Sequence, residues 1–222
     1  MSWKTWYRSF YYQWAPEPED IVLEATDTAL LVIDIQNTYM KSPEDPEELK
    51  RWSPFLDRMS NQVIPNCETL IEACRSKKIE IIFARISCLK EDGRDRSLSQ
   101  KKPGWNYLLL PKDSEGAQFV SQLRPKDDEI ELFKTTDSAI AGTNLRLILH
   151  NMGIKNVICV GIFTDQCISS SVRSLADESF NVIVVEDCCA AATMDLHNKE
   201  LEIINMIYCH VASMKETLEF IP

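Results

Sequence analysis

Three residues with complementary chemistry each end or follow an apolar run of this 222-residue chain. Asp34 ends the run ALLVID, Lys134 ends EIELFK, and Cys167 follows VGIFTDQ. A carboxylate can accept the proton of a thiol, and a nearby ammonium or a helix N-terminus can lower the pKa of that thiol. Backbone N–H groups in the turn before the cysteine can bind an oxyanion. The three residues therefore predict nucleophilic catalysis by a cysteine without a histidine.

Each of these residues also has a purely structural explanation, which the sequence alone leaves open. Asp34 can cap the segment after its run, Lys134 can be solvated at a strand end, and Cys167 can pack as a small apolar side chain. We interpret the seven other cysteines in this last way. If all three residues lie at one edge of a sheet, the catalytic interpretation is favoured for all of them together.

The elements that must position these residues follow from an alternation of apolar runs with longer amphipathic stretches. Nearly continuous apolar runs are typical of strands buried on both faces of a parallel sheet. The predicted strands are residues 28–34, 79–85, 129–133, 156–161, 181–186 and 207–213. The predicted helices are residues 62–76, 143–152, 166–179 and 199–207.

This alternation predicts one α/β domain over residues 1–222. We expect a doubly wound, three-layer sandwich around a mainly parallel, six-stranded, Rossmann-like sheet. Sites in such sheets form outside the carboxyl ends of the strands, which is where Asp34, Lys134 and Cys167 are expected. The sequence contains no GxGxxG loop, so it gives no support to Rossmann-type nucleotide binding, and we expect no cofactor.

Two long polar segments, residues 40–61 and 87–128, follow the first two predicted strands. Long insertions at this edge of a sheet are usually mouth or lid elements, and we expect both to border the site. The candidate substrate contacts are two residues after Asp34 and two aromatic residues in the second insertion: Gln36, Tyr39, Trp105 and Tyr107. For the two aromatic residues of the second insertion, simple packing of the lid is the alternative.

The N-terminal segment, residues 1–20, is unusually aromatic. Seven of the first fourteen residues are aromatic: Trp3, Trp6, Tyr7, Phe10, Tyr11, Tyr12 and Trp14. Such a segment needs an apolar surface to cover it. It is expected to be an arm that packs either on its own domain or on a neighbouring subunit.

The net charge is −10 and the sequence pI is about 4.9. A chain this acidic is poorly suited to bind nucleic acid or an anionic membrane surface. No apolar run is long enough to span a membrane, and the N-terminus lacks the apolar core of a secretory signal. The eight cysteines include no C-x-x-C pair, so we expect free thiols in a reducing, cytoplasmic compartment.

Four segments in order resemble the isochorismatase-like cysteine hydrolases over residues 27–213. The segment TALLVIDIQN is similar to the opening strand of that family with its catalytic aspartate, and FKTTDSAIAGT is similar to its catalytic lysine segment. GIFTDQC resembles its nucleophile turn, and VVEDCCAA resembles a later strand that ends in aspartate and small residues. Each motif alone is weak, but four at this spacing are specific.

The resemblance implies roles for particular residues. Asp34, Lys134 and Cys167 would form the catalytic triad. The Ile162–Phe163 peptide would be a non-proline cis bond, and the N–H groups of Phe163 and Cys167 would bind the oxyanion. Nicotinamidases of the family carry an Asp-x-His…His metal motif, whereas residues 35–149 here contain no histidine. We therefore expect no metal.

The resemblance and the cysteine together predict a hydrolase that cleaves a C–N bond of a small amide or ureido substrate through a thioester. Two alternatives remain: a non-amide hydrolase of the isochorismatase type, which cleaves a vinyl ether, and a catalytically idle binding protein on the same fold. The expected partner is a small-molecule substrate. The resemblance also implies a homo-oligomer, either a dimer or a tetramer.

Overall fold

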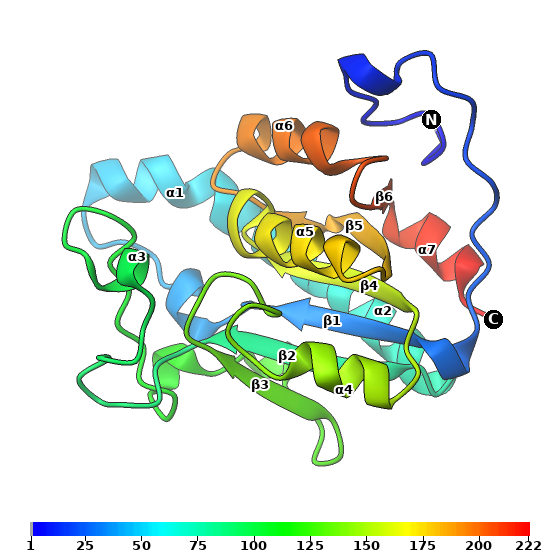
Figure 1. Ribbon diagram of the computed structural model, residues 1–222. Helices are drawn as coiled ribbons and strands as arrows, with labels where there is room; N and C mark the ends of the chain where they lie inside the picture. Colours follow the sequence, from blue (N-terminus) through cyan, green and yellow to red (C-terminus); the bar gives the residue numbers. More distant parts are fainter. Residues whose placement is uncertain (1) are drawn as a thin grey trace.

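The computed structural model describes residues 2–222 and is built on one open sheet (Figure 1). The six strands are all parallel and lie in the order β3-β2-β1-β4-β5-β6. They are β1 (Thr28–Ile33), β2 (Glu80–Ile86), β3 (Ile130–Lys134), β4 (Asn156–Ile162), β5 (Asn181–Ala190) and β6 (His210–Ala212). The predicted doubly wound α/β fold is confirmed, and every predicted strand is present with its ends shifted by a few residues.

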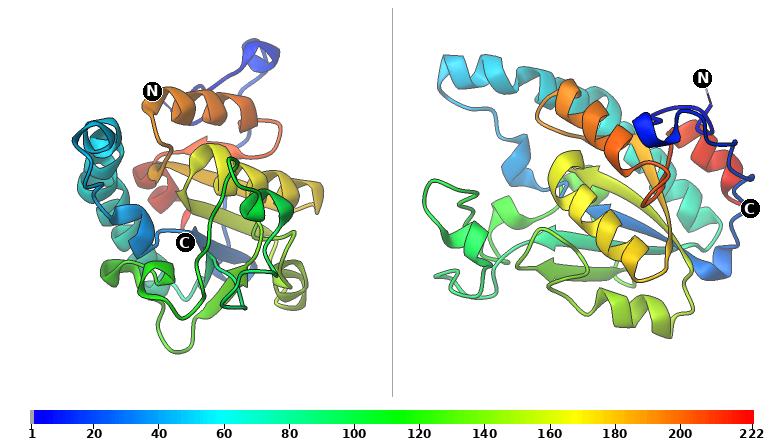
Figure 2. Two further views of the ribbon diagram at one scale, coloured as in Figure 1. Left: turned by 90° about the vertical axis from the view of Figure 1, so that its left-hand side faces the viewer. Right: turned by 45° about the horizontal axis from the view of Figure 1, so that its top comes forward.

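Helices cover both faces of the sheet, which the left view of Figure 2 shows as three layers. Successive β1 side chains point to opposite faces: Leu30 and Val32 join one apolar core, and Leu31 and Ile33 join the other. The first face is covered by α2 (Ile64–Ser76) and α7 (Met214–Phe220). The second face is covered by α4 (Leu145–Asn151), α5 (Ser169–Asp177) and α6 (Met194–Ile204).

The first insertion, for which no helix was predicted from the sequence, is largely helical. Helix α1 (Pro46–Arg58) runs through a π-helical turn, Met59–Val63, directly into α2. Its start signals are present in the sequence, because Asp45 accepts hydrogen bonds from the N–H groups of Glu47 and Glu48 and is followed by proline. The π turn lies just before Pro65, which has no N–H to donate to the preceding turn.

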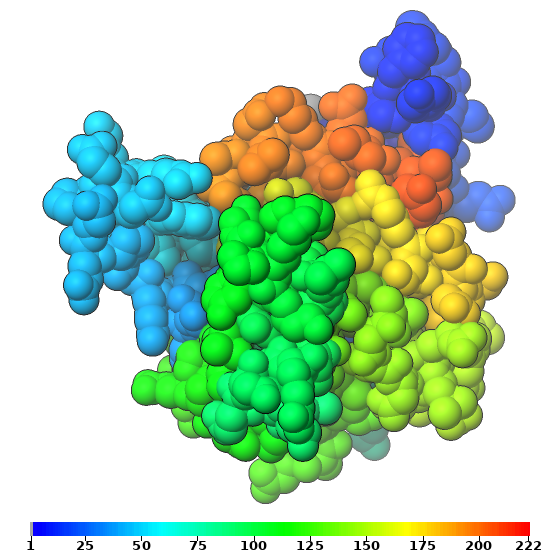
Figure 3. Space-filling view, turned by 60° about the vertical axis from the view of Figure 1, so that its left-hand side comes forward, coloured from blue at the N-terminus to red at the C-terminus, as the bar shows by residue number. Residues whose placement is uncertain are grey.

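The second insertion crosses the carboxyl edge of the sheet as a lid. Figure 3 looks toward this edge: the lid, in green, covers it, and α1 projects beside the lid. The lid contains the short helix α3 (Leu98–Lys101) and is held internally by Arg96. The guanidinium of Arg96 is buried and donates to the carbonyls of Gly93, Gln100 and Leu108. The expected position of this insertion beside the site is therefore correct.

The N-terminal arm is anchored at one end and exposed at the other. The Trp3 ring is buried against Phe220 and His210, and the Trp3 N–H donates to Glu216 Oε1 at 2.8 Å. Beyond this anchor Trp6, Tyr7 and Tyr12 are half-buried, whereas three other aromatic side chains are uncovered: the exposed fractions are 80% for Phe10, 85% for Tyr11 and 94% for Trp14. Packing on its own domain therefore accounts for only part of the arm.

Within residues 2–222, no helix combines the length and the apolar character needed to cross a lipid bilayer.

Candidate active site

A close approach between β1 and β4 brings the candidate aspartate and cysteine to one place. The two strands are neighbours, and Gly161 pairs with Ile33 near their carboxyl ends. Gly161 has φ of +127°, and a Cβ at this position would lie 1.9 Å from the Ile33 carbonyl oxygen. Only glycine fits here. Asp34 follows directly in a left-handed conformation, φ +56°, which turns its side chain at the strand end.

The three predicted catalytic residues meet at the edge of the sheet. The Lys134 Nζ lies 2.5 Å from Asp34 Oδ2 and 3.4 Å from Cys167 Sγ. The other carboxylate oxygen of Asp34 accepts the Ile86 N–H at 2.6 Å. Asp34 and Lys134 are almost completely buried, and Cys167 is 5% exposed. The ammonium therefore contacts both the carboxylate and the thiol and holds the two groups close together.

Burial dominates the ionisation of this group. The pKa of the Cys167 thiol is raised well above its ordinary value, first by burial and then by the negative charge of Asp34, which together outweigh Lys134. Lys134 lowers this pKa, as expected, but burial and Asp34 outweigh it, so the net shift is upward. Burial also raises the pKa of Asp34, despite Lys134. Burial lowers the pKa of Lys134, but Asp34 and Cys167 raise it more, so the net pKa shift is upward.

A narrow cavity of about 50 Å³ opens onto Cys167. The edge-to-face pair of Tyr39 and Phe163 forms part of its wall, with ring centroids 5.4 Å apart. Asn106 and Leu108 of the lid and Asp137 from the segment after β3 also line it. Cys167 thus lines a small pocket with one aromatic wall and several amide and carboxylate groups.

The four residues predicted to contact the substrate differ in whether they line the cavity. Tyr39 lines the cavity, whereas Gln36 is fully buried and donates from Nε2 to the carbonyls of Ile86 and Ala117. Trp105 and Tyr107 lie outside the cavity, 62% and 56% exposed, although Trp105 borders an outer depression. Their neighbours Asn106 and Leu108 line the cavity instead, because successive side chains of this lid segment point in different directions.

The turn between β4 and α5 presents the nucleophile. The Ile162–Phe163 peptide is cis, as the resemblance implies. Thr164–Ile168 then forms a π-helical turn, in which the Ile168 N–H donates to the Phe163 carbonyl at 3.2 Å. Helix α5 starts only after this turn. The amides of Phe163 and Cys167 therefore belong to the irregular backbone that borders the cavity, as an oxyanion site requires.

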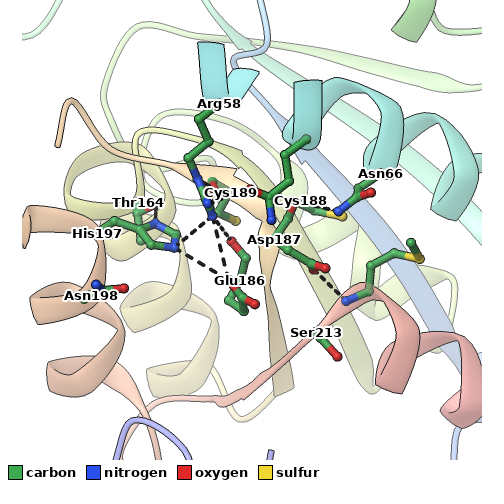
Figure 4. A network of polar contacts seen from close by, with 12 residues as sticks. Arg58, Asn66, Thr164, Glu186, Asp187, Cys188, Cys189, His197, Asn198 and Ser213 are labelled. Carbon is green, nitrogen blue, oxygen red and sulfur yellow. Dashed lines mark hydrogen bonds and ion pairs between the residues drawn. The ribbon is translucent and has the colours of Figure 1, made fainter. Parts of the chain in front are cut away.

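A second polar network lies behind this turn (Figure 4). The Thr164 Oγ1 is 2.8 Å from His197 Nδ1, and the His197 Nε2 is 3.2 Å from an Arg58 Nη2. The guanidinium of Arg58 also donates to the carbonyls of Glu186 and Cys189. Burial lowers the pKa of His197, so this imidazole is neutral near pH 7. The network ties the nucleophile turn to α1, α6 and β5.

Sequence reasoning missed Asp137, Gln166, Arg58 and His197. Asp137 and Gln166 lie within the two motifs quoted for the resemblance, so closer attention to these motifs would have identified them. Arg58 and His197 carried no local signal, because they meet only across 139 positions of the chain. Within residues 2–222, no group of three or more His, Cys, Asp or Glu side chains is arranged to hold a metal ion.

Comparisons with known proteins place this geometry in context. The ureidoacrylate amidohydrolase of Agrobacterium fabrum is 27% identical over 183 residues, 77% of this chain and 78% of that protein. A protein of Arabidopsis thaliana named as a probable inactive nicotinamidase is 28% identical over 179 residues, 79% of this chain and 86% of that protein. A cysteine hydrolase from Pseudomonas syringae superimposes with a TM-score of 0.75 at 19% identity, covering 91% of this chain and 97% of the other.

A family model matches the chain as well as these individual relatives do. The model of the isochorismatase domain matches residues 28–216, which include all six strands, the lid, and the residues Asp34, Lys134 and Cys167. The chain therefore belongs to the isochorismatase family.

Proposed function

We propose that this protein is a cysteine amidohydrolase that cleaves a C–N bond of a small amide or ureido substrate through a thioester. The observation that supports it is the bridge made by the Lys134 Nζ between Asp34 and Cys167 at the bottom of a cavity. The thiol provides a nucleophile and the carboxylate provides a base. A purely structural Asp–Lys pair would not need a thiol on its exposed side.

In the first step, Asp34 takes the proton of the Cys167 thiol while the sulfur attacks the carbonyl carbon. The C–S bond forms, and the carbonyl oxygen becomes an oxyanion that the N–H groups of Phe163 and Cys167 stabilise. The raised pKa of Asp34 suits this role, because it makes the carboxylate a stronger base than an ordinary aspartate. Lys134 stays protonated and keeps Asp34 oriented toward the sulfur.

In the second step, the C–N bond breaks and Asp34 returns its proton to the leaving nitrogen, which departs as ammonia or an amine. A thioester on Cys167 remains. Water then gives a proton to Asp34 and its oxygen attacks the thioester carbon. The C–S bond breaks, the sulfur regains the proton from Asp34, and a carboxylic or carbamic acid leaves. Every proton therefore passes through Asp34.

The test is ammonia release from a panel of primary amides and ureides by the wild-type protein and by Cys167→Ala. We expect turnover in the wild type and a loss of about 10³-fold or more in the variant. Asp34→Asn provides a second variant, which keeps the thiol and removes the base. Intact-protein mass spectrometry after rapid quenching should detect the acyl adduct on Cys167. Turnover that survives in Cys167→Ala would refute the mechanism.

Two alternatives have specific support and distinct outcomes. The family name and the fold allow cleavage of a vinyl ether, which would release a carbonyl product and no ammonia. The raised pKa of Cys167, together with the Arabidopsis relative, allows an idle binding protein. Such a protein would bind small amides without forming an acyl adduct. The same assays therefore separate all three functions.

We extend the proposal to the assembly and the compartment. The exposed arm residues Phe10, Tyr11 and Trp14 are proposed to contact a second copy of the chain in a dimer or tetramer. Light scattering of a variant lacking residues 1–14 should give a smaller mass than the full chain, and an unchanged mass would contradict this role. All eight cysteines are free thiols, which suits a reducing compartment such as the cytoplasm.

A further inference from the structure

The charges around the cavity are not balanced. The side chains that line it include Asp34 and Asp137, and among the described lining residues there is no lysine, arginine or histidine. Asp34 has its counter-ion in Lys134, at 2.5 Å. Asp137 has no ion-pair partner among residues 2–222, and its Oδ1 accepts only from neutral groups there: the amide of Gln100 at 3.4 Å and the thiol of Cys167 at 4.0 Å. One negative charge is therefore left facing the cavity.

This carboxylate lies next to the reacting sulfur. The Asp137 Oδ1 is 4.0 Å from Cys167 Sγ, and the Lys134 Nζ is 3.4 Å from the same sulfur. A carbonyl carbon bound to this sulfur would hold its nitrogen substituents within a few ångströms of Asp137. Carboxylate oxygens accept hydrogen bonds from N–H groups and attract ammonium groups. They repel another carboxylate in a pocket that excludes most water.

The outer depression does not supply a compensating positive charge. It shares Asn106, Asp137 and Gln166 with the cavity and adds Asp165 and Arg173. The charge of Arg173 is already paired, because its Nη1 lies 2.7 Å from Glu200 Oε1. A substrate that approaches Cys167 by this route therefore passes two carboxylates and meets no free cation among the lining side chains.

We infer that Asp137 determines the charge class of the substrate: it selects amides or ureides that are uncharged or positively charged and rejects those that bear a carboxylate. This inference rests on the proposed amidohydrolase function. It also distinguishes the chain from its Agrobacterium relative, since the ureidoacrylate of that protein's name bears a carboxylate. Asp137 is assigned to contact the N–H groups or the ammonium of the substrate.

The first test measures charge discrimination without any turnover. Iodoacetamide and iodoacetate have similar size and transfer a carbon to sulfur with loss of iodide, but only iodoacetate is an anion. Alkylation of Cys167 is followed by peptide mass spectrometry at about 0.15 M salt, where the Debye length is about 8 Å, so that distant charges are screened. The neutral thiol N-acetylcysteinamide gives the intrinsic ratio of the two reagents.

We expect the ratio of iodoacetamide to iodoacetate rates at Cys167 to exceed the reference ratio at least about tenfold, as for like charges brought together. Asp137→Asn should bring the ratio close to the reference. Asp177→Asn makes the same change in net charge at the exposed, far end of α5 and should leave the ratio as in the wild type. An unaltered ratio in Asp137→Asn, or no alkylation of Cys167 by either reagent, would overturn the inference.

The second test uses three amides with one carbon skeleton: butanamide, 4-aminobutanamide and succinamate. Ammonia release should be at least about tenfold lower in kcat/KM for succinamate than for butanamide. In Asp137→Asn the deficit should shrink, and any preference for 4-aminobutanamide should be lost. Equal turnover of succinamate and butanamide by the wild type would refute the inference while supporting the amidohydrolase. The expected alkylation ratio without ammonia release from any amide or ureide would refute the amidohydrolase instead.

Discussion

Two buried polar networks lie on opposite sides of the turn Thr164–Ile168, and they use their charges differently. In front of the turn, the Lys134 ammonium contacts one carboxylate and one thiol beside a cavity. Behind it, the Arg58 guanidinium donates to two backbone carbonyls and to Gln62 Oε1, and contacts His197 (Figure 4). The first cation contacts a thiol that lines the cavity. The groups around the second, which include the His197 imidazole and the Glu186 carboxylate at 3.7 Å, do not line that cavity.

The difference shows how burial alone fails to distinguish a reactive cluster from a structural one. Both networks contain side chains with almost no exposed surface, and in both burial shifts the pKa of a titratable group. In the front network, the proposed nucleophile Cys167 and the proposed base Asp34 both line an open cavity. In the rear network, most hydrogen bonds of the Arg58 guanidinium go to backbone carbonyls of β5. These bonds fix the position of the turn. Changes to the front should therefore abolish turnover, and changes to the rear should mainly lower stability.

The largest effect is expected for Lys134→Met. Without the ammonium, the Asp34 carboxylate is buried with no counter-ion, so the free energy of unfolding should fall by about 3–5 kcal/mol. The kcat/KM should fall by about 10³-fold or more. The double variant Asp34→Asn/Lys134→Met should regain stability in urea unfolding but no activity. Recovery of both would mean that the pair has no chemical role.

Arg58→Ala in the rear network should lower the free energy of unfolding substantially but change kcat much less. Removal of the guanidinium leaves the carbonyls of Glu186 and Cys189 without donors, so the free energy of unfolding should fall by about 3 kcal/mol. The folded fraction should retain kcat within about tenfold of the wild type, since Arg58 touches no reacting atom. Urea unfolding and steady-state kinetics on the same preparation measure both. A loss of kcat as large as that of Lys134→Met would end the distinction between the networks.

The pH dependence of the free energy of unfolding should reflect the protonation of His197 in the rear network. The folded pKa of His197 lies below its unfolded value of about 6.5, because burial disfavours the charged ring. The unfolded state therefore binds more protons in mildly acidic solution, and stability present above pH 6.5 is lost as the pH falls through the folded pKa. His197→Gln should flatten this slope in urea unfolding between about pH 7.5 and 5. The matched control His150→Gln, on the exposed face of α4, should keep the slope.

The smallest effect is expected at the edge of the rear network. Asp187 Oδ1 accepts the Met214 N–H at 2.6 Å, at the start of α7. Asp187→Asn keeps an acceptor oxygen, so the free energy of unfolding should change by about 1 kcal/mol or less. Turnover should not change, since this contact is remote from the nucleophile turn. A drop in kcat without a drop in thermal midpoint would show that the rear network reaches the chemistry through α7.

Much of the fold could be predicted from the sequence, and the features that could not be predicted have identifiable causes. The strands could be predicted because nearly continuous apolar runs rich in β-branched residues are typical of strands that are buried on both faces of a parallel sheet. Helix α1 was expected only as part of a mouth or lid insertion, because the polar composition of the segment and Pro54 obscure the helix-start signals at Asp45 and Pro46. Trp105 and Tyr107 were chosen for their aromatic character, but the direction of successive side chains in the lid was not encoded in residue type.

By itself, the sequence determined which residues end the strands, and therefore that Asp34, Lys134 and Cys167 belong to one edge of a sheet. The tertiary structure decided how they are charged and which other groups join them. Burial raises the pKa of the Cys167 thiol, and the sheet order sets Lys134 against an aspartate 100 residues away. Asp137 facing the sulfur and Arg58 beside His197 followed from packing alone, because electrostatic contacts depend on distances that no local pattern specifies.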